Sequence, residues 1–526
     1  MMGNLLYLRT LKKGFPMVSN RFPFRLLMIL LVLSCGDLSG LAYAGEETVT
    51  LTLKQAISMA VEKNLEVRAE LYNPAMNEAD IRKNRGIYDP MLNLFTNYQQ
   101  STTQPTSTFL SGASISRQKN FQANAGVNQL VPIGGTVGLF FDNLWNRNNS
   151  DSSRGFLNDY WQSELTLSYT QPLLKNFGRE ATELGISVAV NNKEASLDQF
   201  RSKLIDVVTR SRTAYFTLYS LRENLEAKMT ALALARKILE ETKGRVRAGV
   251  LPAMEILNAE FGVATREKER IDAEKNLRDQ MDVVRFLLQI EGNPDVNPID
   301  PPSKEEYPVD ENEVIARALA VRPDLLALRT NLRTADLQTR VAHNRIMPDL
   351  SFVGSAALAG LGRDYGRDLD KVGSAEYPVW SVGLQLTYPI GNRDAKNTFI
   401  KSRLSSEQAR VQVKNLEDTI RNEVKIAVRG IRASYLQLDV ADRGLAYAEE
   451  RLRAYIKKNE VGLATTKEVV DVQNDLVAAK TNQIKAQAEY TIAIGQLWRA
   501  TGEVLEREGI TLNGKEADAL YDSNSR

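Results

Sequence analysis

Histidine and cysteine are almost absent from the 526-residue chain, which contains one of each. A zinc site, a disulfide framework and a histidine-activated nucleophile each need more of these residues. The sequence therefore predicts no metal site, no cofactor and no enzyme. Glycine and proline are also scarce, with 32 and 17 residues, so long disordered tracts are not expected. The formal net charge of +2 gives no reason to expect a nucleic-acid partner.

Long apolar runs are missing as well. Charged residues make up 25% of the chain, so a bundle of membrane-spanning helices is not expected. The N-terminal apolar run Leu26–Leu33 has eight residues, too few to span a bilayer but typical of a signal peptide. Ala42-Tyr43-Ala44 then supplies a cleavage pattern, so we predict a signal peptide at residues 1–44. The alternative is a lipoprotein anchored at Cys35.

The chain contains two similar halves. In one pair of predicted strands, Trp161, Leu165, Leu167 and Tyr169 match Trp380, Leu384, Leu386 and Tyr388. In the long segments that follow, Leu204, Val208, Tyr215, Leu218 and Leu225 match Val424, Val428, Tyr435, Leu438 and Leu445. A proline-rich segment separates the halves, and proline cannot continue a helix. We therefore predict an internal duplication: repeat 1 at residues 45–292, a linker at 293–310, repeat 2 at 311–502 and a tail at 503–526.

Each repeat is expected to run from a helix through strands to a long helix, a tight turn and a returning helix. Alternation of apolar and polar residues is typical of strands with two different faces. Heptad spacing in proline-free stretches predicts long coiled-coil helices. The expected ranges are helices at Leu53–Asn84 and Glu313–Arg345, strands at about 91–172 and 350–389, long helices at Glu180–Lys243 and Asp394–Asn459, and complete helical hairpins at 180–291 and 394–501.

Aromatic residues mark the ends of two equivalent strands, Trp161 and Tyr169 in one and Trp380 and Tyr388 in the other. A strand of this kind fits the aromatic girdle of an outer-membrane barrel, whose spans are ~9–11 residues long. The alternative is an ordinary β-sandwich with aromatic core residues. We expect the barrel, because the inner face of such a sandwich would be unusually polar.

A glycine follows each long helix. Gly249 and Gly462 can take the left-handed conformation that ends a helix, and Pro252 suits the first turn of the next helix. Glu255 and Glu468 fall in the first turns of the returning helices, where the helix dipole favours an acid. Capping alone is therefore one explanation for both acids.

Together, these features resemble the TolC-type outer-membrane efflux channel family, from Leu51 to about Gly502. The best local matches are 'VGLATTKEVVDVQ' from Val461 and 'YTQPLLKNFGRE' from Tyr169. The resemblance implies an α+β membrane protein, a homotrimeric outer-membrane β-barrel continued by a long α-helical coiled-coil tunnel in the periplasm. It implies passive conduction in an efflux or type I secretion system, with a periplasmic adaptor protein, an inner-membrane RND or ABC-type pump and outer-membrane lipid as partners.

The resemblance also assigns roles to residues at the hairpin tips. The expected adaptor-contact residues are Val461, Gly462, Leu463, Gly249, Val250 and Leu251. The expected pore constriction consists of Glu468 and Asp471, with Glu255 and Asn258 as their counterparts in repeat 1. Because Asp471 lies three residues after Glu468, the two carboxylates share one helix face. A ring of such carboxylates favours cations.

Two features depart from the family pattern. The family can close its entrance with aromatic and arginine residues beside the second tip glycine, but here these flanks are Asn459 and Ala464, so that latch is not carried over. Other ionic ties are left open, from Lys457, Lys458, Arg245 or Arg247. In addition, 'FQANAGVNQLVPIGGTVGLFFDNLW' from Phe121 indicates an extra hairpin. A trimer would then have eighteen strands instead of the usual twelve, and the sequence leaves this choice open.

A second class of protein also combines a signal peptide with helical hairpins, namely a periplasmic adaptor or coiled-coil scaffold without a channel. Adaptors normally carry one hairpin and lack two full repeats with amphipathic strands, which favours the channel. An enzyme is the least favoured class, because the only histidine, His343, lies at a predicted helix end where a cation suits the dipole. The exported substrate and the class of pump are left open.

Overall fold

The computed structural model describes residues 48–104, 115–149, 157–511 and 514–524. The residues from Thr48 onward form one compact unit. The predicted signal peptide at residues 1–44, including Cys35, lies outside the described residues and stays a prediction.

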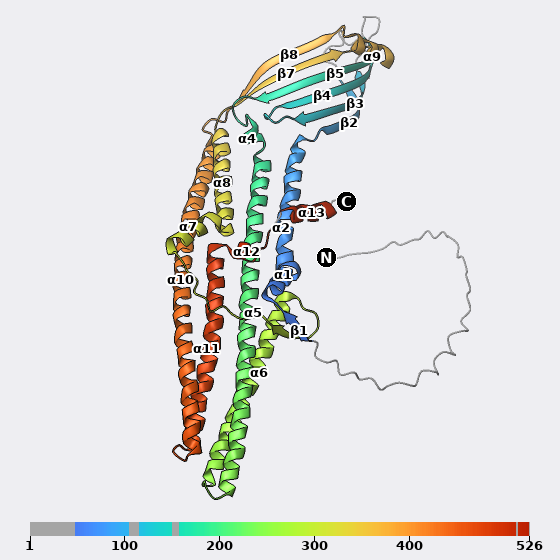
Figure 1. Ribbon diagram of the computed structural model, residues 1–526. Helices are drawn as coiled ribbons and strands as arrows, with labels where there is room; N and C mark the ends of the chain where they lie inside the picture. Colours follow the sequence, from blue (N-terminus) through green and yellow to red (C-terminus); the bar gives the residue numbers. More distant parts are fainter. Residues whose placement is uncertain (1–47, 105–114, 150–156, 512–513, 525–526) are drawn as a thin grey trace, which may run out of the picture. The chain divides into compact units, whose positions relative to one another are not determined.

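The helices and strands of the described residues follow the labels in Figure 1. The helices are α1 (Leu53–Lys63), α2 (Leu65–Arg85), the 3-10 helix η1 (Gly86–Tyr88), α4 (Arg179–Thr182), α5 (Leu184–Arg247), α6 (Met254–Leu288), α7 (Glu311–Val321), α8 (Pro323–Asn344), α9 (Tyr365–Ser374), α10 (Arg393–Glu460), α11 (Thr466–Thr501), α12 (Val504–Arg507) and α13 (Lys515–Asn524). The strands are β1 (Thr48–Leu51), β2 (Met91–Thr103), β3 (Ser116–Leu130), β4 (Thr136–Asn148), β5 (Asp159–Pro172), β6 (Asp295–Pro298), β7 (Asp349–Ala359) and β8 (Pro378–Thr387).

Two long helices form the backbone of the helical part (Figure 1). α5 has 64 residues and α10 has 68, so at 1.5 Å per residue each is about 100 Å long. α2 and α6 pack along α5, whereas α8 and α11 pack along α10. Because α5 also packs against α8 and α11, the two sets of helices form one continuous wall. Among the helices of the described residues, none has the length and apolarity that a bilayer crossing would need.

The predicted heptad residues form the core of this wall. Leu204 and Val208 of α5 and Val424 and Val428 of α10 are completely buried. Full burial of a side chain of this kind contributes about 1.5–3 kcal/mol. The apolar stripes therefore hold the long helices against their neighbours, and coiled-coil packing along their whole length stays a prediction.

Each opening helix is broken into two, so the prediction of one continuous helix was wrong. Asn64 separates α1 from α2; its backbone is extended and its Oδ1 accepts the amide N–H groups of Glu66 and Val67 at 2.9 and 3.3 Å. Such a side-chain cap starts a new helix. Arg322 separates α7 from α8, because the residue before a proline avoids the helical conformation.

Two boundaries near the long hairpins also differ from prediction. The first long helix begins at Leu184, after the short helix α4, and not at Glu180. The helix after the first tip begins at Met254, so Pro252 precedes its first turn instead of lying in it. The Pro252 carbonyl nevertheless accepts the amide N–H of Glu255 at 3.1 Å. The proline therefore still leads into the helix.

The segment predicted as a linker, residues 293–310, contains a short strand. β6 pairs in parallel with β1 to form a two-stranded sheet. The buried Tyr215 of α5 holds this sheet: its hydroxyl donates to the Leu51 carbonyl at 2.9 Å and accepts the Ile299 and Asp300 amides at 3.1 and 2.9 Å. These bonds satisfy backbone groups that burial removes from water.

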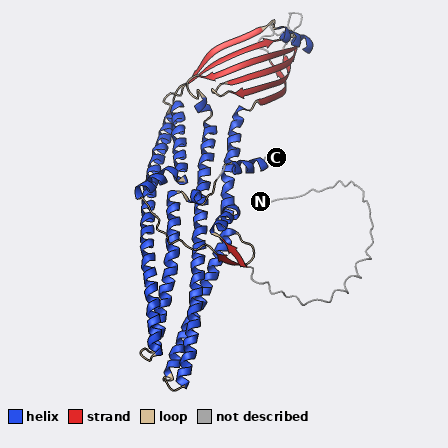
Figure 2. Ribbon diagram, viewed as in Figure 1, coloured by secondary structure: helices blue, strands red, loops and turns tan. Residues whose placement is uncertain are grey.

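The other described sheet, red in Figure 2, has six strands in the order β2-β3-β4-β5-β7-β8, which are labelled in Figure 1. All neighbouring strands are antiparallel. The extra hairpin predicted from Phe121 is β3–β4, inserted between β2 and β5. The hairpin turns where the Val131 amide donates to the Gly135 carbonyl at 2.8 Å, and Gly134 has a φ of 90°. Among the described residues, the chain therefore has six strands in this sheet.

The register gives this sheet two different faces. One row of directly opposed residues is mostly apolar: Leu92, Val127, Leu139, Leu167, Ala356 and Trp380. An adjacent row on the opposite face has small polar residues and glycine: Asn128, Gly138, Ser168, Ser355 and Ser381. Side chains alternate between the faces of a strand, so the first face is apolar along this middle row and the second is mainly polar.

Short helices flank both parts of this fold. α9 packs on the end of β5 that is remote from the helices, where the fully buried Asp368 accepts the Ser163 amide at 3.2 Å and the Ser163 hydroxyl at 2.5 Å. The Tyr365 ring of α9 lies 4.8 Å from the Trp161 ring. In the predicted tail, α12 packs on α5 and α13 packs on α2.

Candidate functional site

The two hairpin tips have the same turn. We define tip 1 as residues 248–253, between α5 and α6, and tip 2 as residues 461–465, between α10 and α11. Gly249 and Gly462 have φ values of 75° and 78°, in the left-handed region that an L side chain avoids. A Cβ on either glycine would meet no atom within 4 Å. The glycines are therefore required by the backbone conformation and not by lack of space.

The helices that leave the two tips begin differently. Thr465 and Glu468 form a capping box at the start of α11: the Glu468 amide donates to Thr465 Oγ1 at 3.2 Å, and the Thr465 amide donates to Glu468 Oε2 at 2.7 Å. This reciprocal pair satisfies two free amides at the helix start. No side chain caps the start of α6.

The four predicted constriction residues lie in the first two turns of α6 and α11, but the structure does not join them by contacts within the described chain. Glu468 and Asp471 are both exposed. The Thr465 amide, followed by the Thr465 hydroxyl, holds the pKa of Glu468 below its ordinary value. Both bonds from Thr465 fall on one carboxylate oxygen, Oε2. Glu255 and Asn258 are half-buried, and Glu255 Oε2 is buried without a hydrogen-bond partner.

A contact between the tips was missed in the sequence. Arg245, at the end of α5, donates from Nη1 to Asn459 Oδ1 at 3.0 Å and to the Asn459 carbonyl at 3.4 Å. The Asn459 side chain in turn donates to the Ala464 carbonyl at 2.8 Å, which closes tip 2. Arg245 had been named as a source of an ionic tie, but its partner is a neutral amide. No local pattern indicates this pair, because the residues are 214 positions apart.

Two of the other basic residues near the tips have local partners. The Lys458 ammonium lies 5.0 Å from the centre of the Tyr455 ring, and the Arg247 guanidinium donates to the Lys243 carbonyl one turn earlier at 3.3 Å. Above them, Arg451 and Asp475 join α10 to α11 at 2.7 Å. An apolar cluster lies between α5, α10 and α11, with Leu452, Val469 and Val472 buried. The hairpins are therefore packed together close to their tips.

Apolar side chains project from both tips. Val250 of tip 1 is 69% exposed, and Val461 and Leu463 of tip 2 are 70% and 78% exposed. Leu251 is half-buried. An exposed apolar surface next to a tight turn gains nothing from water and is typical of a contact with another protein.

The pairing of the strands places only part of the predicted aromatic girdle in one row. Trp161 lies in a row of four directly opposed aromatic residues, Tyr98, Phe121, Trp145 and Trp161. The first three were missed in the sequence. Phe121 and Trp145 lie on strands without a counterpart in repeat 2, and the strand of Tyr98 was predicted only from its alternating apolar residues. Tyr169 lies opposite Val137 on the same face, at the end near the helices.

The corresponding residues of repeat 2 are placed differently. Trp380 lies opposite Ala356, in the middle row of the apolar face, and Tyr388 follows the end of β8. Both rings are exposed. The register therefore does not place Trp380 in the aromatic row of Trp161, and a complete girdle stays a prediction.

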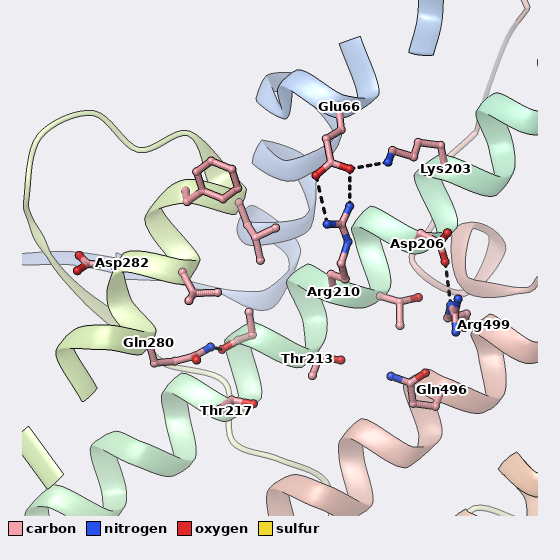
Figure 3. Close-up of a pocket in the computed structure, with 15 residues that line it drawn as sticks. Glu66, Lys203, Asp206, Arg210, Thr213, Thr217, Gln280, Asp282, Gln496 and Arg499 are labelled. Carbon is pink, nitrogen blue, oxygen red and sulfur yellow. Dashed lines mark hydrogen bonds and ion pairs between the residues drawn. The ribbon is translucent and has the colours of Figure 1, made fainter. Parts of the chain in front are cut away.

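A hollow of about 980 Å³ lies on the helical wall between α2, α5, α6 and α11 (Figure 3). At 3.6 residues per turn, its α5 residues Arg210 and Thr217 face away from Tyr215, which holds the β1–β6 sheet. The hollow and this small sheet therefore lie on opposite faces of α5. The helical wall therefore has two different sides, one with the hollow and one with the small sheet.

Ion pairs line the hollow (Figure 3). Glu66 accepts from Arg210 at 2.8 Å and lies 2.5 Å from the Lys203 ammonium. The Arg210 hydrogen bond, followed by that of Lys203, lowers the pKa of Glu66 to about 2. Asp206 pairs with Arg499 across α5 and α11 at 2.8 Å. Glu66 and Asp206 are thus each paired with basic side chains, and the hollow offers no nucleophile–base pair.

The structure also provides no arrangement suited to catalysis at the only histidine. His343 lies in the last turn of α8, as predicted, and its ring is 5.2 Å from the Phe399 ring. Across the described ranges, no three His, Cys, Asp or Glu side chains lie close enough to hold a metal ion.

Comparisons with known proteins agree with this geometry. The outer membrane efflux protein family matches residues 143–288 and 314–503. The outer membrane efflux protein BepC of Brucella suis is 24% identical over 331 residues, which cover 61% of this chain and 69% of BepC. The outer membrane protein TolC of Escherichia coli is 23% identical over 322 residues, which cover 58% of this chain and 63% of TolC.

Solved structures share the fold at low sequence identity. The CmeC outer membrane channel of Campylobacter jejuni has a TM-score of 0.62 and 14% identity, covering 90% of this chain and 89% of CmeC. The open MtrE outer membrane channel of Neisseria gonorrhoeae has a TM-score of 0.56 and 17% identity, covering 87% and 91%. Because the family match spans more than half of the sequence, the chain belongs to the outer membrane efflux protein family and is an outer-membrane protein that extends into the periplasm, not an enzyme.

Proposed function

We propose that this protein is the outer-membrane channel of a tripartite efflux or type I secretion system. Three copies would share one β-barrel, and their helices would enclose a tunnel across the periplasm. The channel makes and breaks no covalent bond; the energy comes from an inner-membrane pump of the RND or ABC type. The observation that carries the proposal is the two-faced six-stranded sheet joined to a wall of ~100 Å helices.

The open edges of the sheet support closure with other copies. β2 and β8 are the edge strands, and nearly all of their residues are exposed. Unpaired strand edges are not stable in lipid, where every backbone polar group needs a partner. Pairing β8 of one copy with β2 of the next would satisfy both edges. Six strands from each of three copies would give eighteen in the closed barrel.

The order of elements supports the proposed duplication. A broken opening helix, strands, a long helix and a returning helix occur before residue 292 and again after residue 310. β3 and β4 are then the insertion that makes the first repeat longer. A duplication of this kind would place two different tips on each subunit, so that a trimer has six tips at its periplasmic end.

The tips would provide both the adaptor contact and the entrance. Val461, Gly462 and Leu463, together with tip 1, would receive a periplasmic adaptor through their exposed apolar side chains. Glu468 and Asp471 would form carboxylate rings by three-fold symmetry, and such rings favour cations. The hollow lined by Glu66 and Arg210 would face the tunnel. The small sheet, on the opposite side of α5, would then lie on the outside of the trimer.

The sheet assignment is tested by charge placed on each face. Leu165 and Leu167 lie on the apolar face of β5, and Thr166 and Ser168 lie on the polar face of the same strand. A lipid-facing arginine costs ~2–4 kcal/mol at the middle of the bilayer. The double change Leu165→Arg and Leu167→Arg should therefore block outer-membrane assembly, measured as heat-resistant trimer in outer-membrane fractions. The matched double variant with Thr166→Arg and Ser168→Arg should assemble. If this variant fails to assemble and the leucine variant assembles normally, the assignment of the two faces is wrong.

A further inference from the structure

The basic residues of the six-stranded sheet are gathered at one place. Its strands contain three Lys or Arg residues, Arg117 and Lys119 on β3 and Arg147 on β4. All three lie at the end of the sheet remote from the helices, and all three are exposed. Two acids within the strands, Asp142 and Glu164, lie directly opposite each other on the polar face. A third acid, Asp159, lies opposite Arg147 at the cationic end, and a fourth, Asp349, begins β7. The basic residues of the strands are therefore confined to one end of the sheet.

The three cations lie on the apolar face. Lys119 is two residues from Phe121 and Arg147 is two residues from Trp145, so each shares a face with its aromatic neighbour. Arg117 lies two residues further along β3. At ~3.4 Å per residue, Lys119 and Arg147 lie about 7 Å beyond the aromatic row. This face thus runs from the apolar row, past Asn143 and Ser163, where Ser163 bonds to Asp368 of α9, to the aromatic row and then to the three cations and Asp159.

The cations are not neutralised within the described residues. Lys119 lies directly opposite Arg147, and like charges in this position destabilise a strand pair. Asp159 is opposite Arg147 on the other side, with 3.6 Å between Nε and Oδ2. One acid thus faces three cations. Among the described residues no acidic partner is found for Arg117 or Lys119, so an external anion would relieve this repulsion.

The surroundings identify the anion. A residue beyond the aromatic row of a lipid-facing barrel surface lies at the level of the lipid headgroups. The protein extends from the outer membrane into the periplasm, so the end of the sheet remote from the helices meets the outer leaflet. Phosphate is the anionic group that arginine binds with two parallel hydrogen bonds and lysine binds as a point charge.

We propose that Arg117, Lys119 and Arg147 bind the phosphate groups of a phosphorylated glycolipid of the outer leaflet. The proposal rests on the barrel orientation in the proposed function. The bound lipid would offset the repulsion between Lys119 and Arg147 and would fix the height of the aromatic row in the membrane. The amphipathic helix α9 lies at the same end, where Tyr365 contacts Trp161, and it would border the lipid site.

The test measures lipid binding to the full-length trimer in detergent by native mass spectrometry. The probes are bisphosphorylated lipid A, the same lipid with both phosphates removed, and inorganic phosphate. The variant changes Arg117, Lys119 and Arg147 to Gln. The matched control changes Lys54, Lys63 and Arg68 to Gln, three exposed cations on α1 and α2 with the same loss of charge.

Wild type and control should bind the phosphorylated lipid alike, and the variant should bind it about tenfold or more weakly, since each basic residue near a lipid headgroup contributes about 1 kcal/mol. Equal binding by the variant, equal binding of the dephosphorylated lipid to the wild type, or displacement of the lipid by equimolar inorganic phosphate would each overturn the proposal. If the triple variant fails to form heat-resistant trimer, the single variant Lys119→Gln replaces it, and its binding of the phosphorylated lipid is compared with that of the wild type. Equal binding would then overturn the proposal. A wild type that binds the lipid but conducts no ions would contradict the proposed function and leave this site standing.

Discussion

The two hairpin tips share a turn but not a helix start. In each, the amide after the glycine, that of Val250 or Leu463, donates to the carbonyl five residues earlier, at 2.9 and 2.8 Å. Only tip 2 continues into a capping box, formed by Thr465 and Glu468. Reversal of the chain at each tip thus needs little more than a glycine and backbone hydrogen bonds of this kind. The capping box at the start of α11 adds a carboxylate beside tip 2, and our proposal that this end of the channel selects by charge depends on it.

The largest effect is expected from an acid at the apolar tip. Leu463→Glu should reduce efflux by about tenfold or more, because a carboxylate forced into an apolar contact costs more than ~1.4 kcal/mol. Trimer assembly and single-channel behaviour should be unchanged, and Leu463→Met should keep efflux. Val250→Glu makes the matching change in tip 1. Unchanged crosslinking of Leu463→Glu to the adaptor would contradict the assignment of tip 2.

The acids at the start of α11 distinguish a selectivity ring from a simple cap. Glutamine can replace glutamate in a capping box, so Glu468→Gln removes the charge and keeps the cap. Combined with Asp471→Asn, it should abolish cation preference and block by multivalent cations in reconstituted channels. Glu255→Gln at the start of α6 should have the smaller effect, because that acid is half-buried. If both properties survive the double change, these acids are caps and the constriction lies elsewhere.

The bond between the tips should restrain the entrance. Arg245→Ala removes the donor to Asn459 and should raise single-channel conductance, since a hydrogen bond of a charged group contributes about 1.5–3 kcal/mol. Asn459→Ala should have an equal or larger effect, because it also removes the bond from Asn459 to the Ala464 carbonyl. The double variant should add little to Asn459→Ala alone, because Arg245 then has no side-chain acceptor left to lose. Additive effects of the two changes would show that the pair does not act as one restraint.

A local stability change should follow loss of the cap. Thr465→Ala should destabilise the start of α11 by about 1 kcal/mol. Ala253→Thr, at the start of α6, should produce no comparable gain, because Ala253 already has a helical backbone and cannot act as an N-cap. Hydrogen exchange at the first amides of α6 and α11 measures both. Equal protection of α11 in Thr465→Ala and wild type would contradict the role of the capping box.

The smallest effect concerns pH. The pKa of Glu468 is lower in the folded protein than its ordinary value of 4.5. The stabilisation by its carboxylate is therefore complete above pH 4.5 and is lost as the pH falls through the lower, folded value. Glu468→Gln lacks this dependence, so the difference in α11 protection between wild type and variant should shrink below pH 4.5. A constant difference across that range would contradict the lowered pKa.

Periodic patterns allowed much of the fold to be predicted from the sequence. Heptads located the long helices, because a buried stripe such as Leu204 and Val208 repeats along the whole helix. Alternation located strands for the same reason. The break at Arg322 was also predictable, since Pro323 follows it. The break at Asn64 was not, because asparagine caps some helices and lies inside others.

Long-range contacts between short or isolated groups could not be predicted in the same way. The β1–β6 pair has four residues in each strand and depends on the buried Tyr215 hydroxyl. The bond from Arg245 to Asn459 joins two single side chains in different hairpins. Such contacts depend on how the helices pack, which no local sequence period specifies.

The most direct test of passive conduction is a recording from the purified protein in a planar lipid bilayer without a pump or an energy source. The wild type should give discrete, cation-selective conductance steps, and Arg245→Ala should give larger ones at the same voltage. If both proteins insert as heat-resistant trimers and neither conducts ions above the protein-free bilayer, the protein is not a channel.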